Sequence, residues 1–342
     1  MELGKNYRRD GWRLVGGRWF RPALSVDLSE LVRTDLNGRK ISIEPNLSER
    51  VEAQLIGGRK PVVEVIGSAW CWKLDVTGRV WTTDRLSTTR MLTVTAVSDD
   101  PPPVGTVELS CVMMRPDSTV IMGRGLIDDV VHEVTILLSD TSGFHLSVQC
   151  MSAEMRVTPV VSLQGENLFE LFDGHAEEAR RYVRPLFAAL FNSPTALGPG
   201  AGDVYRIFSE IAPDSSTDSR VNALLDLMDS PDPAQRDAAH EQLEQLGDAA
   251  VLSLMRLDRS RFRIEVRQRV DALITRVTRF ADADVTSKLN DADFLIDCQY
   301  SSDARVRKIA AEHLQKSFGI LIDESMTFDV IEQHRGQIGA MN

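Results

Sequence analysis

Between residues 39 and 165, hydrophobic and polar side chains alternate with a period of two, as in residues 92–96 and 130–138. Such alternation places one side of a strand against a core and the other side towards water. The runs are short, and turn signals separate them: Asn37-Gly38, Gly57-Gly58, Thr77-Gly78 and Ser142-Gly143. The pattern predicts roughly eight to ten strands in an antiparallel β sandwich or barrel.

Ahead of this region, residues 12–20 predict a tight hairpin. Gly16-Gly17 stands at its centre and supplies the positive φ angles of a primed turn. We therefore expect a tryptophan-rich hairpin or arm over residues 1–38, followed by the β-rich domain over residues 39–165.

After Gly165 the hydrophobic period changes to 3.6, which indicates helices. Residues 166–191 predict a long amphipathic segment that Pro185 breaks or kinks, because proline lacks the backbone donor. The stretch SPTALGPGAG, residues 193–202, is typical of a linker. We therefore expect bridging helices and a linker over residues 166–202, and a helical domain over residues 203–342.

The helical domain contains an internal repeat. One helix opens at Asp232 and another at Asp303, and aligning Arg236 with Arg307 brings further pairs together: Ala239 with Ala310, Glu241 with Glu312, and Leu243 with Leu314. A third copy lies between them, because Val266-Arg267 takes the place of Val306-Arg307. A shorter apolar helix precedes each copy. A helix pair repeated in this way predicts stacked neighbours that share one core.

The pattern Asp-x-x-Val-Arg-x-x-Ala-x-x-x-Leu at residues 303–314 resembles HEAT-like repeats, and the resemblance extends over residues 217–318. The first copy departs from it at Gln235, and the middle copy lacks the turn aspartate and has Val270 in place of alanine. The resemblance implies a HEAT-like α-solenoid that acts as a protein–protein interaction scaffold. The β-rich region resembles no family. The predicted fold class is therefore α+β with two domains.

The charge balance limits the possible partners. The 342 residues carry 39 basic and 50 acidic side chains, a net charge of −11, so general binding to nucleic acid or to an anionic membrane is not expected. No apolar stretch is long enough for a membrane span, and no signal sequence follows Met1. None of the four cysteines forms a CxxC pair. We expect a cytoplasmic protein with reduced cysteines.

Arginines are concentrated between residues 256 and 279. This segment contains eight arginines and three acidic residues, whereas the chain as a whole is acidic. Arginine forks bind carboxylates and phosphates well, so this segment is a candidate partner-binding site. The candidate residues are Arg259, Arg261, Arg263, Arg267, Arg269 and Arg276. The alternative interpretation is a solvated helix face, or ion pairs between neighbouring repeats.

Trp70 and Trp72 share a strand face and could form an aromatic platform for a ligand, although burial in a core is the commoner fate of tryptophan. His132 and His313 fall on apolar faces and are interpreted as core residues. His175 and Glu178 could meet across a helical turn, but a metal site needs a third ligand. We predict no catalytic set, no metal site and no cofactor.

The leading hypothesis is a non-enzymatic adaptor whose short solenoid binds another protein. A second hypothesis is an enzyme or small-ligand sensor, with its site in the β domain or an interdomain cleft. A third is a phosphate or nucleic-acid binder that uses the segment Arg256–Arg279, and its binding would weaken steeply with salt.

Overall fold

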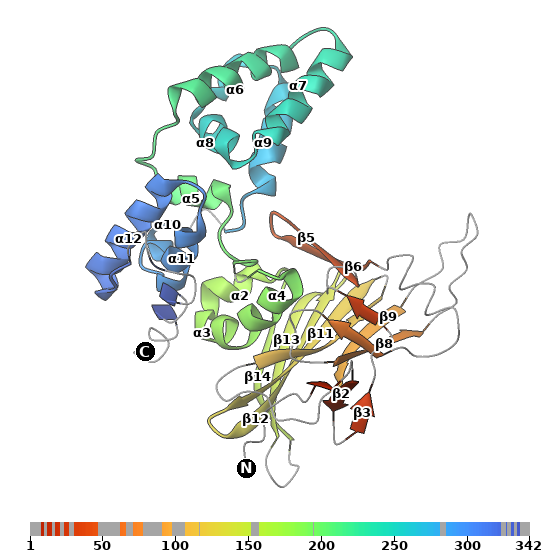
Figure 1. The fold of residues 1–342 in the computed structure, drawn as a ribbon. Coiled ribbons are helices and arrows are strands. Elements are labelled where there is room, and N and C mark those ends of the chain that lie inside the picture. Colours follow the sequence, from red (N-terminus) through yellow and green to blue (C-terminus); the bar gives the residue numbers. More distant parts are fainter. Residues whose placement is uncertain are drawn as a thin grey trace, which may run out of the picture. The chain divides into compact units, whose positions relative to one another are not determined.

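The structure is a computed structural model of the full chain. It describes residues 31–46, 107–115, 117–151, 157–193, 195–280 and 285–322, together with 326, 330–331 and 334–335. The backbone alone is described for residues 8–9, 12–15, 18–20, 24–26, 62–65, 71–77, 91–97, 171–173, 176 and 285–286. The fold is mixed α+β, with antiparallel strands in its first half and helices in its second half (Figure 1).

Two compact units make up the chain, and each consists of two stretches. The β-rich unit comprises Met1–Leu36 and Ile41–Leu197, and the helical unit comprises Asn37–Lys40 and Gly198–Asn342. The division after Leu197 falls within the glycine- and proline-rich residues 193–202. The helices expected as a bridge, residues 166–191, lie in the β-rich unit.

One nine-stranded sheet dominates the β-rich unit, in the order β14-β13-β12-β11-β10-β9-β8-β7-β4. Neighbouring strands in it are antiparallel except β4 and β7, which are parallel. Its strands are β4 (Leu24–Val26), β7 (Val62–Val65), β8 (Cys71–Thr77), β9 (Met91–Val97), β10 (Val107–Met114), β11 (Ser118–Ile127), β12 (Val130–Ser139), β13 (Gly143–Met151) and β14 (Val157–Gly165).

Two smaller sheets accompany it. The first joins β1 (Arg8–Arg9), β2 (Trp12–Val15) and β3 (Arg18–Phe20), and the second joins β5 (Val32–Asn37) and β6 (Lys40–Pro45). Strands β2 and β3 pair antiparallel, with Val15 opposite Arg18, so the hairpin predicted over residues 12–20 is present.

The core of the large sheet follows from the period-two pattern. Ile121, Ile136 and Leu146 lie opposite one another on β11, β12 and β13, and all three have an exposed fraction of 0%. A two-residue turn joins β11 to β12, with φ angles of 52° at Asp128 and 60° at Asp129. Both angles are left-handed, as a type I′ hairpin turn requires.

Helices α2 (Phe169–Gly174), α3 (Ala176–Glu178) and α4 (Arg184–Phe191) follow the last strand, with a π-helix, η2 (Ala179–Val183), directly before α4. Pro185 therefore lies in the first turn of α4, directly after η2, so the helical hydrogen-bond pattern changes just before the proline. Helix α4 packs on the sheet at Gly123, since a Cβ there would come within 2.5 Å of Leu186 Cδ2.

Among the described residues, the helical unit contains eight α-helices and two short 3-10 turns after its glycine-rich start. These are α5 (Ala201–Ile207), α6 (Ser215–Met228), α7 (Pro233–Gln245), α8 (Asp248–Arg256), η3 (Arg259–Arg261), α9 (Ile264–Arg276), α10 (Val285–Lys288), α11 (Ala292–Asp297), η5 (Cys298–Tyr300) and α12 (Ala304–Phe318), as far as the described residues show.

Helices α6 to α9 lie next to one another (Figure 1), and their buried apolar side chains form one core. Its fully buried members include Val221, Leu225, Ala239, Val266 and Val270. Each of these residues lies on the apolar stripe of its helix, so the core is the reason why the four helices hold together. Across the described residues, no helix combines the length and the apolar character that crossing a membrane requires.

Candidate functional site

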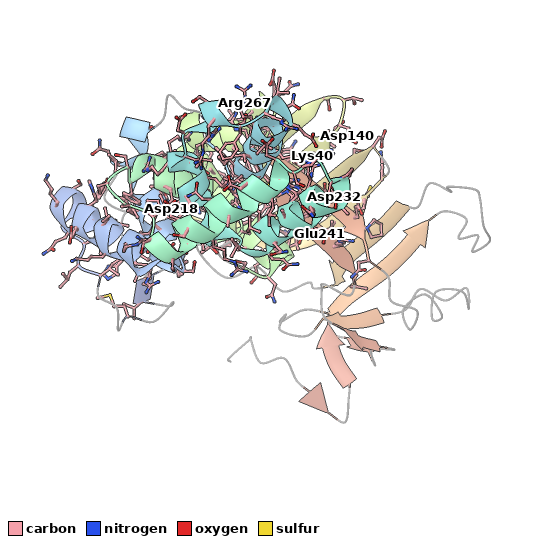
Figure 2. All side chains as sticks on the ribbon, turned by 90° about the horizontal axis from the view of Figure 1, so that it is seen from above. Lys40, Asp140, Asp218, Asp232, Glu241 and Arg267 are labelled. Carbon is pink, nitrogen blue, oxygen red and sulfur yellow. The ribbon has the colours of Figure 1, made fainter. Side chains whose placement is uncertain are left out.

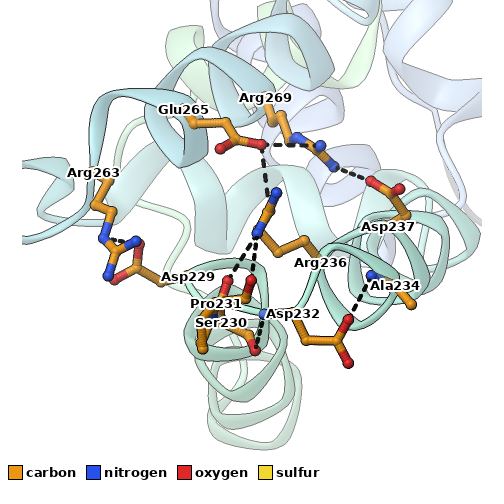
Figure 3. Close-up of polar contacts among 10 residues, drawn as sticks. All are labelled: Asp229, Ser230, Pro231, Asp232, Ala234, Arg236, Asp237, Arg263, Glu265 and Arg269. Carbon is orange, nitrogen blue, oxygen red and sulfur yellow. Dashed lines mark hydrogen bonds and ion pairs between the residues drawn. The ribbon is translucent and has the colours of Figure 1, made fainter.

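The turn between α6 and α7 is held by the residues that the repeat pattern singles out (Figure 3). Asp232 caps α7, because its carboxylate accepts a hydrogen bond from Ala234 N at 3.0 Å, and Asp232 N donates to Ser230 Oγ at 3.2 Å. Arg236 Nη1 then reaches back and donates to the carbonyl oxygens of Ser230 at 3.1 Å and Pro231 at 3.3 Å. The arginine therefore closes the turn.

The same set of bonds recurs before α12. The Asp303 carboxylate accepts a hydrogen bond from Arg305 N at 2.9 Å, and Asp303 N donates to Ser301 Oγ at 3.2 Å. Arg307 Nη1 donates to the carbonyl oxygens of Ser301 at 2.7 Å and Ser302 at 3.3 Å. Two segments that are 71 positions apart, from Arg236 to Arg307, thus build their turns in the same way.

The middle copy departs from this arrangement at Arg267. The residue at the cap position of α9 is Arg263, whose side chain makes no capping hydrogen bond. The turn before α9 is instead the short helix η3, which Asp258 caps through Ser260 N at 3.0 Å. Arg267 is exposed, and within the described residues its side chain has no hydrogen bond or ion pair.

Helices α7 and α9 are joined by ion pairs between their facing sides: Arg236 with Glu265 at 3.5 Å, Asp237 with Arg269 at 3.0 Å, and Glu244 with Arg276 at 2.8 Å. These partners are half-exposed, so each pair contributes only about 0–1 kcal/mol. Their value is geometric, because they fix which positions of the two helices lie opposite each other.

The other candidate arginines also have partners within the helical unit. Arg259 pairs with Asp271, and Arg263 pairs with Asp229 at 3.2 Å. Arg261 donates to the Asn222 side-chain oxygen and lies over the ring of the neighbouring Phe262. Of the six arginines that the sequence singled out, Arg267 alone lacks such a partner among the described residues.

Substitutions of the three aligned arginines are expected to differ in their effect on stability. Replacing Arg236 or Arg307 by alanine removes a charged donor from two turn carbonyls and should cost about 1.5–3 kcal/mol. Replacing the exposed Arg267 should change stability by less than about 0.5 kcal/mol. Urea unfolding of the full-length variants, followed by circular dichroism, measures all three. Equal losses for Arg267 and Arg307 would contradict the assignment of different roles.

The predicted aromatic platform lies largely beyond what the structure describes. Trp70 is outside the described residues. Trp72 lies on β8 and pairs with Ala96 of β9 and Val63 of β7, but its side chain is not described. The platform therefore stays a prediction.

The β-rich unit brings together three side chains that the sequence did not group. Tyr182 Oη lies 3.3 Å from His132 Nδ1, and Cys150 Sγ lies 3.5 Å from His132 Nε2. Burial is the main reason why the pKa of His132 is lowered and that of Tyr182 is raised, so both side chains are neutral at pH 7. His132 and Cys150 are directly opposed on β12 and β13. A sequence-based prediction could have paired His132 with Cys150 only by predicting the register of β12 against β13.

Metal-binding chemistry finds little support in the described part of the chain. His175 Nδ1 lies 4.0 Å from Glu178, as the helical spacing suggested, but no third ligand joins them there. His313 lies beside the ring of Phe208, with 6.3 Å between the ring centres. No group of three or more candidate ligands occurs among the described residues.

A buried carboxylate organises the start of the helical unit. Asp203 has an exposed fraction of 0%, and it accepts hydrogen bonds from the backbone N–H groups of Gly200 at 3.0 Å, Arg279 at 2.8 Å and Phe280 at 3.0 Å. Arg206 Nη2 lies 3.3 Å away. Burial raises the pKa of Asp203 against the opposing effect of these bonds. Gly200 is the N-cap of α5, so Asp203 is the third residue of the helix.

The second stretch of the helical unit, Asn37–Lys40, contacts the same segment. Gly38 N donates to Arg276 O at 2.7 Å, and Arg39 Nε donates to Arg279 O at 2.6 Å. Gly38 has a φ of +58°, and a Cβ there would lie 2.8 Å from Thr275 O. Both facts require glycine at this position.

A buried ion-pair cluster fixes Arg335 to α11. Its guanidinium donates to Asp293 at 2.9 Å and to Asp297 at 2.5 Å, and the three residues are 7%, 5% and 4% exposed.

Tyr205 also donates a hydrogen bond across this unit, to Asp303 Oδ2 at 3.3 Å. Burial and the nearby Asp303 charge raise the pKa of Tyr205 to about 12, so the phenol remains a donor at neutral pH.

Comparison of the chain with protein-family models, with curated proteins and with solved structures found no match.

Proposed function

We propose that this protein is a non-enzymatic scaffold that binds another protein through a short HEAT-like α-solenoid over residues 217–318. The observation that carries the proposal is the repeated turn, in which Arg236 and Arg307 close equivalent connections through the same kinds of bonds. Repeated helix pairs stack into elongated surfaces, and such surfaces suit the binding of extended partners.

The stacking of α6–α7 on α8–α9 supports the same proposal. One apolar core runs through all four helices, and the ion pairs between α7 and α9 join equivalent helices of successive copies. The β-rich unit would then be the second module, a sandwich or barrel in the terms of the sequence prediction. Its nine strands in one continuous order favour a curled, barrel-like sheet. The compartment that we propose is the cytoplasm, where the partner would also be found.

The phosphate or nucleic-acid alternative receives less support from the arginine segment. Carboxylates of the same unit engage Arg259, Arg263, Arg269 and Arg276. Intramolecular carboxylates compete with phosphates for the same guanidinium groups. An enzyme or small-ligand sensor could draw on the cluster of His132, Tyr182 and Cys150, but these side chains are held by contacts with one another.

Site-specific photo-crosslinking of the full chain tests the proposal. A photoreactive amino acid is placed at Leu227 on α6, and in a matched variant at Val160 on β14; both positions are exposed. In extract from the cells that make the protein, we expect a discrete crosslinked partner from position 227 and none from position 160. Crosslinks from position 160 alone, or from neither position, would count against a solenoid that binds proteins.

A further inference from the structure

One face of α9 is left without a partner among the described residues. Ile264, Arg267 and Gln268 are spaced by three and four positions, so they lie on the same side of the helix. All three are exposed, and Ile264 is 65% exposed although it is a large apolar residue. The ion pair of Arg263 with Asp229 places the start of α9 beside the end of α6, where Leu227 is 46% exposed.

Arg267 is available for a partner because the middle repeat copy closes its turn without it. In the outer copies the aligned arginine, Arg236 or Arg307, donates hydrogen bonds that close a turn. In the middle copy that turn is the helix η3, which Asp258 caps, so the architecture no longer needs the arginine. Arg267 therefore keeps the arginine of the repeat pattern but makes no side-chain contact of this kind among the described residues.

Within the described part of the chain, Arg267 is the cation of this face that lacks a counter-charge. Nearby carboxylates are already engaged: Asp229 by Arg263, Glu265 by Arg269, and Asp271 by Arg259. Figure 2 locates Arg267 on α9, and Asp218 and Glu241 on α6 and α7 of the same unit. The face therefore combines an apolar side chain with an unmatched guanidinium.

We propose that this α9 face, Ile264, Arg267 and Gln268, docks an acidic peptide segment of a partner protein. A carboxylate of the segment pairs with the Arg267 guanidinium, and an apolar side chain next to it covers Ile264. The guanidinium fork binds a carboxylate in a bidentate way, and contact with Ile264 removes apolar surface from water. The inference rests on the proposed scaffold function and assigns it a surface and a class of partner.

A polynucleotide fits this face less well than a peptide does. The other arginines of the segment are held by carboxylates, so a phosphate backbone, which has a negative charge at every nucleotide, would meet a single available cation on this face. An acidic peptide needs one well-placed fork and an apolar contact, and the face supplies both.

Fluorescence anisotropy with the full-length protein tests this proposal. The probe is a fluorescein-labelled peptide in which one leucine is flanked by aspartates and glutamates. Matched peptides replace the acids by their amides, or the leucine by serine. The variants are Arg267→Glu, Ile264→Ser and the control Arg220→Glu, which reverses an exposed α6 arginine without a partner in the described chain.

We expect Arg267→Glu to weaken binding of the acidic peptide by about tenfold or more, and Ile264→Ser by several-fold, whereas Arg220→Glu stays within about twofold. Amide and serine peptides should bind more weakly to the unmodified protein. Equal weakening by Arg220→Glu, or tighter binding of single-stranded DNA than of the peptide, would overturn the proposal. If position 227 still crosslinks a partner while Arg267→Glu has no effect on the peptide, the scaffold function stands and this surface is wrong.

Discussion

Replacing Arg335 by alanine should lower the free energy of unfolding of the helical unit by about 3–5 kcal/mol. The guanidinium lies between Asp293 and Asp297, and all three residues are less than a tenth exposed. Without the arginine, two carboxylates remain in a site with little water. The penalty is then the desolvation of those charges and not only the loss of two hydrogen bonds. Urea unfolding of the full chain, followed by circular dichroism, gives the change.

The triple variant Arg335→Met, Asp293→Asn, Asp297→Asn tests the cause. It removes the arginine and the two charges together, so it should recover a substantial part of the stability that Arg335→Ala loses. Arg305→Ala is the matched control, because Arg305 is half-exposed and pairs with Asp303 at 2.7 Å near the surface. A loss for Arg335→Ala as small as that for Arg305→Ala would show that the buried cluster does not stabilise the unit.

Replacing Asp203 by asparagine, a change of almost no volume, should cost about 2–4 kcal/mol. Oδ2 accepts from Gly200 N and Arg279 N, and Oδ1 accepts from Phe280 N and from Arg206. Both oxygens are therefore acceptors, and an asparagine NH₂ group at either place would face N–H donors. The site has no exposure to water that could relieve this mismatch.

Asp203→Ala should cost at least as much as the asparagine variant, and thermal unfolding of both proteins measures the comparison. Asp226→Asn is a suitable control, because Asp226 is exposed on α6 and should tolerate the same change within about 0.5 kcal/mol. If Asp203→Asn unfolds at the temperature of the unmodified protein, the carboxylate is not what holds the backbone from Arg279 to Phe280.

The period-two pattern was a sufficient guide to the strands because burial enforces it. Ile121, Ile136 and Leu146 alternate with less buried neighbours in their own strands, and the same alternation sets their register across the sheet. A shift by one residue would expose all of them. The Asp128-Asp129 turn could not be found in the same way, since its left-handed angles depend on the strands on both sides.

The repeat pattern predicted which arginines correspond but not what each one does. Arg236, Arg267 and Arg307 align in sequence, yet Arg236 and Arg307 donate to turn carbonyls and Arg267 has no side-chain partner among the described residues. Arg236 also pairs with Glu265. The sequence does not indicate which arginine meets a backbone carbonyl. The Arg263 at the cap position of α9 was the visible sign that the middle copy differs. Arg335 carried no signal, because its carboxylates lie about forty residues earlier in an unrelated element.

The helical unit takes the four residues Asn37–Lys40 from within the first half of the chain. Because the unit is built from two separate stretches, cutting the gene at one place does not separate the two units cleanly. A single cut between Leu197 and Gly198 leaves the β-rich unit whole in the N-terminal fragment, which also keeps Asn37–Lys40, whereas the C-terminal fragment is an incomplete helical unit. The C-terminal fragment loses the donors Gly38 N and Arg39 Nε that satisfy the carbonyls of Arg276 and Arg279. Supplying the residues around Asn37–Lys40 in trans, as a separate hairpin peptide, should therefore restore stability to a C-terminal fragment that lacks them.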